Sequence, residues 1–301
     1  MGSTNTRTRK SGALRVALAQ IEPLLGDVRG NIRAHLRAAR RAARLGARLL
    51  VFPELSLTGY RLQDLVAEVA IRADDPVLRP LLAASRRIAL VVGLVEESER
   101  HRYHNSALLL HGGRIVHVHR KLYLPDYGLF EEGRYFAAGD GLRAFTTPLG
   151  RMGILICEDL WHPSTALILA QDGADYLLVL SNSPTQGIGS TEGFLNQSTW
   201  RDLLKVTSQL QTTYVVWVNR VGFEDGVNFG GGSCVVDPSG RIAAQAALFE
   251  EDLLVCDLDR SALRRARTFF PLLRDERLPL LAVEVERLLG RGTRPTGRRR
   301  P

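Results

Sequence analysis

Short apolar runs recur between residues 14 and 258, and polar segments separate them. Leu14–Ala19 and Leu49–Phe52 are short and apolar enough to be buried strands. Asn31–Ala47, which lies between them, is rich in Ala, Leu and Arg, and these residues favour a helix. A further strand is predicted at Ile88–Val95. The chain is therefore expected to open with a strand, a crossover helix and a second strand.

A Gly-Gly pair marks the point where the pattern changes from crossover to hairpin. The strand candidates Ser106–Leu110 and Ile115–His119 flank the run His-Gly-Gly-Arg, which suits a tight turn between antiparallel strands. A second hairpin is predicted between Gly232–Val236 and Ile242–Gln245, around the turn Asp237-Pro238-Ser239-Gly240. Each turn is expected to join strands that are neighbours in a sheet.

The second half of the chain continues the alternation of strands and helices. Further strands are predicted at Met152–Ile156, Tyr176–Leu180, Tyr214–Val218 and Leu253–Leu258, and helices at Ser164–Gln171 and Phe194–Leu210. Beyond residue 258 the chain is rich in Leu, Arg and Glu, which favours helices. Crossovers and hairpins in one chain indicate an α/β (mixed α+β) layered sandwich with helices on both sides, not a doubly wound sheet. Because no linker rich in Pro, Gly or Ser interrupts these elements, we expect one domain over residues 13–290.

Composition and charge narrow the classes of function. With 301 residues, of which 45% are hydrophobic and 24% charged, the chain can bury a large core, which excludes collagen, a disordered protein and a small disulfide scaffold. The formal net charge of +8 would suggest nucleic acid or an anionic membrane as a partner. The cations of residues 1–10 and 291–301, which have no acidic residue beside them, equal this net charge in number. The segment between them is therefore formally neutral.

We therefore expect residues 1–12 and 291–301 to be disordered basic tails that aid solubility. Neither tail contains an aromatic residue on which a base could stack, so no nucleic-acid partner is predicted. No apolar stretch approaches the roughly 18 residues of a membrane span, and no signal peptide is visible at the start. We accordingly predict no membrane partner and a cytoplasmic location.

The cysteines and histidines do not form a metal-binding pattern. Cys157, Cys234 and Cys256 are widely spaced, form no CxxC motif and leave at least one thiol free, as in a reducing compartment. Cys234 and Cys256 lie within strand candidates, where packed thiols are common. His117 and His119 alternate along one strand candidate with no carboxylate expected nearby, which is typical of a half-exposed strand. No metal site is predicted.

Three residues with complementary chemistry each follow a strand candidate. Cys157 comes directly after the apolar run Gly153–Ile156, Glu54 follows Leu50–Pro53, and Lys121 closes the first predicted hairpin. Singly, each has an ordinary explanation: a packed thiol, a solvated loop carboxylate and a surface cation. Together they supply the nucleophile, the base and the cation that acyl transfer from an amide requires. Burial at a strand end would raise the pKa of such a carboxylate and suit it to take a thiol proton.

Three segments around these residues resemble the nitrilase, or carbon–nitrogen hydrolase, superfamily. They are FPELSLTGY (52–60), HRKLYLPDYGLFEEGRYF (119–136) and GILICEDLW (153–161). The further segments VALAQIEPLLGDVRGN, HNSALLL and GGSCVVDPSG extend the resemblance over about residues 13 to 260. The resemblance implies a four-layer α-β-β-α sandwich whose chemistry needs no metal and no organic cofactor.

Carried over position by position, the resemblance also implies the roles of individual residues. Glu54 would be the general base, Lys121 the cationic stabiliser and Cys157 the nucleophile. Glu132, which occupies the glutamate position of the family's F-x-E-x-R-x-F pattern, would be a supporting carboxylate. The backbone N–H of Glu158 would help Lys121 to stabilise the oxyanion.

The substrate contacts are expected on loops that overlook this site. The candidates are Tyr127, Glu158, Trp161, His162 and Ser181, and the last belongs to the loop Ser181-Asn182-Ser183-Pro184, which should overlook the pocket. For His162, a solvent-facing position with no contact to the substrate is an equally good interpretation. The glycine-containing residues 186–192 could form a lid over the pocket.

The segments KLYLPDYGLFEEGRYF and ICEDLW are most similar to the glutaminase domain of glutamine-dependent NAD synthetases. The 301 residues contain no ATP-pyrophosphatase signature of the Ser-Gly-Gly-x-Asp-Ser kind, so we expect no NAD synthesis by this chain alone. A free-standing amidase that cleaves a small amide and releases ammonia or an amine is the favoured function. A glutaminase subunit that supplies ammonia to a separate synthetase partner is the alternative. A binding protein that retains the fold without activity is the third hypothesis.

The resemblance further implies a homodimer or a larger homo-oligomer. The apolar, Arg-rich segment Phe269–Leu289 could provide such a contact, and an amphipathic helix of the core is an equally good interpretation of the same pattern.

Overall fold

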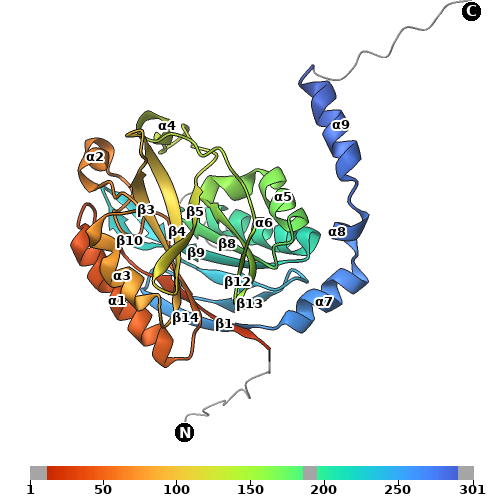
Figure 1. Ribbon diagram of the computed structural model, residues 1–301, viewed down its shortest axis with the longest axis horizontal. Helices are drawn as coiled ribbons and strands as arrows, with labels where there is room; N and C mark the ends of the chain where they lie inside the picture. Colours follow the sequence, from red (N-terminus) through yellow and green to blue (C-terminus); the bar gives the residue numbers. More distant parts are fainter. Residues whose placement is uncertain (1–11, 186–194, 291–301) are drawn as a thin grey trace, which may run out of the picture.

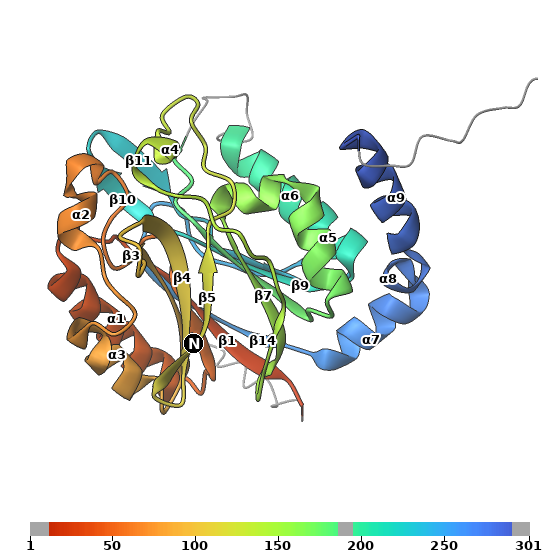
Figure 2. The same cartoon turned by 45° about the horizontal axis from the view of Figure 1, so that its top comes forward.

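Two six-stranded sheets lie face to face, with helices on the outer side of each sheet (Figures 1 and 2). The computed structural model describes residues 12–185 and 195–290. Helices α1 (Val28–Arg44) and α3 (Arg79–Ala84) cover the first sheet, and α5 (Pro163–Gln171) and α6 (Leu195–Gln211) cover the second. The layers therefore follow the order α-β-β-α, which confirms the fold predicted from the sequence.

The first sheet has the strand order β14-β1-β2-β3-β4-β5. Its strands are β1 (Leu14–Gln20), β2 (Leu49–Val51), β3 (Ala89–Glu97), β4 (Tyr103–His111), β5 (Arg114–Arg120) and β14 (Asp252–Leu258). The second sheet has the order β13-β12-β9-β8-β7-β6. Its strands are β6 (Phe145–Thr147), β7 (Gly150–Ile156), β8 (Tyr176–Ser181), β9 (Tyr214–Asn219), β12 (Cys234–Val236) and β13 (Ile242–Gln245).

The directions of the strands follow the predicted change from crossover to hairpin. Strands β1, β2 and β3 run parallel, whereas β3, β4 and β5 are antiparallel. The turn after β4 places Gly112 and Gly113 at φ of 64° and 87°, which glycine adopts without a steric penalty. In the second sheet β7, β8 and β9 are parallel, so their C-terminal ends lie at the same edge.

Alternation of side chains along each strand divides the core into two parts. In β1, Val16 and Leu18 pack between the sheets, while Ala17 and Ala19 pack with the core under α1 and α3. All four side chains are buried. Burial on both faces explains why the strand sequences are apolar almost without interruption.

The ends of some elements differ from the prediction for local reasons. Helix α1 begins earlier than predicted because the side chain of Asp27 caps it and accepts a hydrogen bond from the Gly30 nitrogen at 2.8 Å. The helix stops before Gly46, whose φ is 77°. Cys234 is buried as predicted, but Cys256 is only half-buried because β14 is the edge strand of the first sheet.

Shorter elements and a helical extension complete the described chain. They are α2 (Val66–Val69), α4 (Glu132–Tyr135), the 3-10 helices η1 (Gln63–Leu65), η2 (Pro76–Leu78) and η3 (Cys157–Trp161), the two-stranded sheet of β10 (Val221–Glu224) and β11 (Val227–Gly230), and α7 (Arg260–Phe269), α8 (Leu272–Asp275) and α9 (Leu278–Leu288). Helix α8 lies against the outer helices of the second sheet, where Nε2 of Gln171 donates to the carbonyl oxygen of Leu273 at 3.0 Å, and α9 extends beyond it (Figure 1). No side chain of α9 is buried, so the interpretation of this segment as a core helix is wrong.

Within the described ranges, no helix has the length and apolarity to span a membrane.

Gly93 in β3 allows the chain that carries Glu54 to pass close to the first sheet. A Cβ atom at Gly93 would lie 2.4 Å from the backbone nitrogen of Leu55 and 2.6 Å from the carbonyl oxygen of Pro53. Because backbone atoms cannot move aside as a flexible side chain can, Gly93→Ala should lower the free energy of unfolding by about 1–3 kcal/mol. Urea unfolding followed by circular dichroism measures this change.

The matched control for this experiment is Gly141→Ala, because no atom lies within 4 Å of a Cβ added there. This variant should unfold like the wild-type protein. Equal stability of the two variants would contradict the close approach as the reason for glycine at position 93.

Candidate active site

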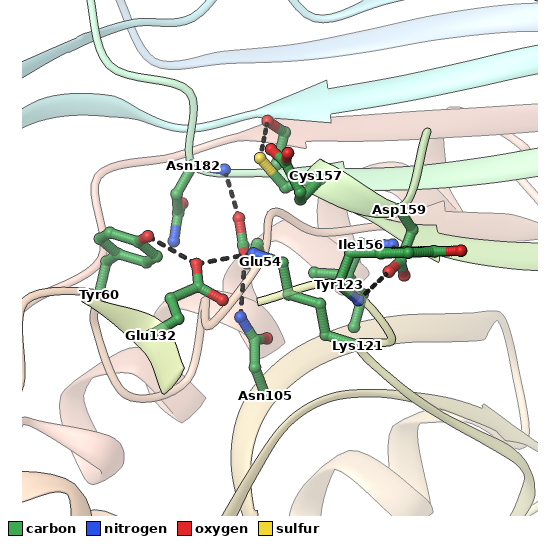
Figure 3. A network of polar contacts seen from close by, with 12 residues as sticks. Glu54, Tyr60, Asn105, Lys121, Tyr123, Glu132, Ile156, Cys157, Asp159 and Asn182 are labelled. Carbon is green, nitrogen blue, oxygen red and sulfur yellow. Dashed lines mark hydrogen bonds and ion pairs between the residues drawn. The ribbon is translucent and has the colours of Figure 1, made fainter. Parts of the chain in front are cut away.

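Glu54, Lys121 and Cys157 come together at one edge of the sandwich although they lie far apart in the sequence (Figure 3). Glu54 follows β2 and Lys121 follows β5, both in the first sheet, whereas Cys157 follows β7 in the second. All three side chains are buried. The site depends on the two sheets facing each other, because neither sheet carries all three residues.

The carboxylate of Glu54 accepts three hydrogen bonds. Its Oε1 atom lies 2.8 Å from Nζ of Lys121 and 2.7 Å from Nδ2 of Asn105, and its Oε2 atom accepts a bond of 2.8 Å from the backbone nitrogen of Asn182. These donors come from β4, the end of β5 and the end of β8. Donors on three sides hold the carboxylate in one orientation within a buried site.

Lys121 lies between two carboxylates. Its Nζ atom donates to Oε1 of Glu54 at 2.8 Å and to Oε1 of Glu132 at 2.7 Å, and the Tyr60 hydroxyl also donates to Oε1 of Glu132 at 2.6 Å. Burial by itself would lower the pKa of Lys121, but Glu132 and Glu54 together raise it well above its usual value. The lysine therefore stays positively charged at neutral pH.

Cys157 begins the 3-10 helix η3 directly after β7. Its φ is 44°, in the left-handed region that residues other than glycine rarely adopt. The Ser181 hydroxyl donates to its Sγ atom at 3.5 Å. Burial and the negative charge of Glu54 raise the pKa of the Cys157 thiol, although Lys121 opposes them. The thiol is therefore protonated in the resting site and needs a base before it can react.

Asp159 is a buried carboxylate that the sequence interpretation did not single out. Its Oδ1 atom accepts hydrogen bonds from the backbone nitrogens of Leu122 and Tyr123 at 2.9 and 3.1 Å. Its Oδ2 atom contacts the Ile156 nitrogen at 2.9 Å and Nε2 of His119 at 2.8 Å. Asp159 thus joins the segment after Lys121 to the segment that carries Cys157. The expectation that no carboxylate lies near His119 is wrong.

Tyr60, Asn105 and Asn182 also belong to this network. The sequence interpretation did not select Tyr60 or Asn105, and it placed Asn182 in a loop near the pocket without giving it a role. Tyr60 ends the segment FPELSLTGY, and Asn105 lies in HNSALLL, so both were within segments that resemble the family. Asn182 follows Ser181, which was selected. The position of each within a recognised segment was the available signal, but their contacts depend on the fold.

Two predicted substrate contacts lie near Cys157, and a third lies at the surface. Ser181 is buried against the thiol. Glu158 is half-buried, and its Oε2 atom accepts a hydrogen bond of 2.9 Å from the hydroxyl of Tyr127, which is 58% exposed. Partial burial together with Glu158 raises the pKa of Tyr127 to about 12, so its hydroxyl remains a donor at neutral pH.

Trp161 and His162 follow in η3 and just after it, and each packs against another aromatic ring. Trp161 is 38% exposed and meets Trp200 edge to face, with ring centroids 5.4 Å apart. The half-buried ring of His162 stacks on Tyr123, with a centroid distance of 3.5 Å. The lid predicted at residues 186–192 lies outside the described residues.

A cavity of about 310 Å³ borders the network. Tyr60 and Glu132 form part of its wall, together with residues of η1, α2 and α4 and the segment before α4. Cys157 does not line this cavity, so the cavity reaches the network from the side of Glu132. In the part of the chain that the structure describes, no group of three or more His, Cys, Asp or Glu side chains could hold a metal ion.

Two facing sheets, with a buried glutamate, lysine and cysteine at their common edge, define a layered α/β protein of the nitrilase type. The family model for carbon-nitrogen hydrolases matches residues 15–268. The chain belongs to the carbon–nitrogen hydrolase family.

Curated relatives share the same region. The chain is 33% identical over 283 residues to the glutamine-dependent NAD(+) synthetase of Thermotoga maritima, a match that covers 91% of this chain and 48% of the relative. It is 31% identical to the enzyme of the same name from Acinetobacter baylyi, over 82% of this chain and 44% of the relative. The chain therefore spans less than half the length of these relatives.

Solved structures show the same fold in two kinds of protein. A glutamine-dependent NAD+ synthetase from Acinetobacter baumannii aligns with a TM-score of 0.74 and 33% identity, over 83% of this chain and 46% of that one. An amidase of the nitrilase superfamily from Nesterenkonia AN1 aligns with a TM-score of 0.75 and 28% identity, over 91% of this chain and 98% of that one.

Burial raises the pKa of Glu132 from 4.5 to about 7, although Lys121 lowers it, and this shift predicts a pH-dependent stability. Between pH 4.5 and pH 7, Glu132 holds a proton in the folded state that it has lost in the unfolded state. The contribution of Glu132 to stability therefore falls as the pH rises. Glu132→Gln removes this titration. The unfolding free energy of the variant relative to the wild type should therefore increase from pH 4.5 to pH 7 in denaturant titrations.

Glu131→Gln, at the exposed neighbouring residue, is the matched control. Its unfolding free energy relative to the wild type should show no such trend. A constant difference between Glu132→Gln and the wild type across the same pH range would contradict a raised pKa at Glu132.

Proposed function

We propose that this protein is a cysteine-dependent amidohydrolase that cleaves a small amide through a thioester intermediate and releases ammonia or an amine. The observation that carries the proposal is the buried cluster in which the Cys157 thiol lies beside the linked charges of Glu54, Lys121 and Glu132. Membership of the carbon–nitrogen hydrolase family supports the same class of chemistry.

In the first half of the reaction, Glu54 takes the proton of the Cys157 thiol and Sγ attacks the amide carbonyl carbon. The carbonyl oxygen gains the negative charge, which Lys121 and the backbone N–H of Glu158 stabilise. The C–N bond then breaks, and Glu54 returns the proton to the leaving nitrogen. The acyl group remains on Cys157 as a thioester.

In the second half, water enters and Glu54 removes one of its protons as the oxygen attacks the thioester carbon. The C–S bond breaks, the acid product forms, and the proton from Glu54 restores the thiol. Glu132 fixes the position of Lys121 throughout, since the two groups are 2.7 Å apart. Because Lys121 is buried and paired, it serves both oxyanions without losing its charge.

The proposal assigns the substrate contacts to the loops around Cys157. These contacts are Tyr127, Glu158, Trp161, His162 and Ser181. It treats residues 13–290 as one hydrolase domain between basic tails, in a cytoplasmic protein that assembles as a homo-oligomer. The exposed apolar side chains of α9, which include Leu281 and Val283, support a contact with another copy of the chain.

Cys157→Ala should lower ammonia release from the best amide substrate by at least about a thousandfold, because no other group can form the thioester. The measurement is a screen that scores ammonia release from simple primary amides, glutamine, asparagine, ω-amides of keto acids and N-carbamoyl amines. Cys234→Ala alters another buried thiol and should retain turnover. Unchanged turnover in a folded Cys157→Ala variant would refute the mechanism.

The second candidate function is a glutaminase subunit that supplies ammonia to a separate synthetase. The similarity to glutamine-dependent NAD synthetases at 31–33% identity favours it. The two functions differ in what they need for turnover. A free-standing amidase should hydrolyse simple amides at the same rate with and without an NAD synthetase that lacks its own glutaminase domain. Glutamine turnover that rises only when that protein is added would favour the subunit instead.

A further inference from the structure

Four buried polar atoms around Glu54 and Lys121 have no hydrogen-bond partner in the described part of the protein. They are Oδ1 of Asn105, Oε2 of Glu132, and both Nδ2 and Oδ1 of Asn182. The Asn182 side chain is the extreme case, because the residue is 1% exposed and neither end of its carboxamide is paired. An unpaired buried polar group costs about 1–3 kcal/mol, so these atoms are expected to bind water or a ligand in solution.

The position of Asn182 connects it to both the nucleophile and the base. Its backbone nitrogen donates to Oε2 of Glu54 at 2.8 Å, and the preceding residue, Ser181, donates to Sγ of Cys157. Figure 3 shows the Asn182 side chain extending toward the place where Tyr60 and Glu132 meet. The contact with Glu54 uses only the backbone of Asn182. Its unpaired side chain therefore remains available to contact the group on which Glu54 acts.

Glu132 also has one carboxylate oxygen without a partner. Its Oε1 atom already accepts from both Lys121 and the Tyr60 hydroxyl, whereas its Oε2 atom is buried and unpaired. Above about pH 7, where Glu132 is ionised, the network therefore offers three unused acceptors: Oδ1 of Asn105, Oε2 of Glu132 and Oδ1 of Asn182. In the proposed reaction the nitrogen that leaves must approach Glu54, which protonates it. An unsubstituted amide nitrogen brings two N–H donors, one for Oε2 of Glu132 and one for Oδ1 of Asn182.

We propose that Asn182, acting with Glu132, is a specificity-determining residue that binds the NH2 group of a primary amide during C–N cleavage. This inference rests on the proposed amidohydrolase function. An N-alkyl amide would replace one donor by carbon and leave a buried acceptor unpaired, so the site should reject it. An ester has no N–H donor and should gain nothing from Asn182, although it would form the same thioester.

The test compares butyramide, N-methylbutyramide and methyl butyrate as substrates of the wild type and of Asn182→Leu, which has a similar volume but no polar atoms. We expect kcat/KM for butyramide to fall about 10- to 100-fold, the loss expected for one hydrogen bond within a charged site. The value for methyl butyrate should stay within a few-fold of the wild type. The ratio of kcat/KM for butyramide to kcat/KM for N-methylbutyramide should fall by the same factor as kcat/KM for butyramide itself.

The ester separates a loss of specificity from simple damage to the site. If kcat/KM for butyramide and methyl butyrate fall together, Asn182 merely positions Glu54 and the proposal is overturned. If neither changes, the side chain makes no contact and the proposal is again overturned. Asn182→Ala replaces Asn182→Leu if the leucine variant does not fold. Asn228→Leu, at a half-buried position of β11, is the matched control and should leave all three rates unchanged.

A binding measurement keeps this inference distinct from the proposed function. In Cys157→Ala, which cannot form a thioester, butyramide should raise the melting temperature more than N-methylbutyramide does, and Asn182→Leu in that background should abolish the difference. If the wild type turns over no amide but Cys157→Ala still prefers butyramide to N-methylbutyramide in binding, the proposed function is refuted and the role of Asn182 is not. Equal binding of both amides to Cys157→Ala would overturn the role of Asn182.

Discussion

The buried ammonium group of Lys121 holds the candidate site together. It lies within 2.8 Å of Glu54 and Glu132, and its charge offsets part of the cost of burying these two carboxyl groups. The two carboxyl groups offer more acceptor sites than one ammonium group can fill, so neutral donors are needed as well. Asn105, Asn182 and Tyr60 supply these hydrogen bonds. Glu54 is thus held beside a protonated thiol in a buried site.

The need to bring charges and hydrogen-bond donors together around Lys121 explains much of the surrounding architecture. The donors and charges come from strands of both sheets, so the sheets must face each other with the C-terminal ends of β2 and β7 at the same edge. Asp159 reinforces that arrangement, because its two oxygens bind backbone nitrogens from the segments after β5 and at the end of β7. Cys157 meets the network through a left-handed backbone conformation, which the packed surroundings impose.

Prediction from sequence was most successful where local signals and tertiary demands agree. The strands were recognisable because both of their faces are buried, and the turn at Gly112 and Gly113 because its backbone suits glycine. It failed where a contact partner comes from a distant segment. The partner of His119 is Asp159, forty residues further along the chain, and the side chains of α9 are exposed although their apolar spacing resembles that of a core helix.

The sequence by itself determined the order of elements, the layered fold and the candidate site. Glu54, Lys121 and Cys157 lie in local motifs at the ends of strands, and Glu132 lies in a motif that resembles the family's pattern. Only the tertiary structure decided which of their atoms meet and which remain unpaired. The physical reason is that hydrogen bonds and burial depend on distances between segments, which no local pattern encodes. Asn182 illustrates this difference: the sequence placed it in a loop near the pocket, but its buried, unpaired carboxamide is visible only in the folded site.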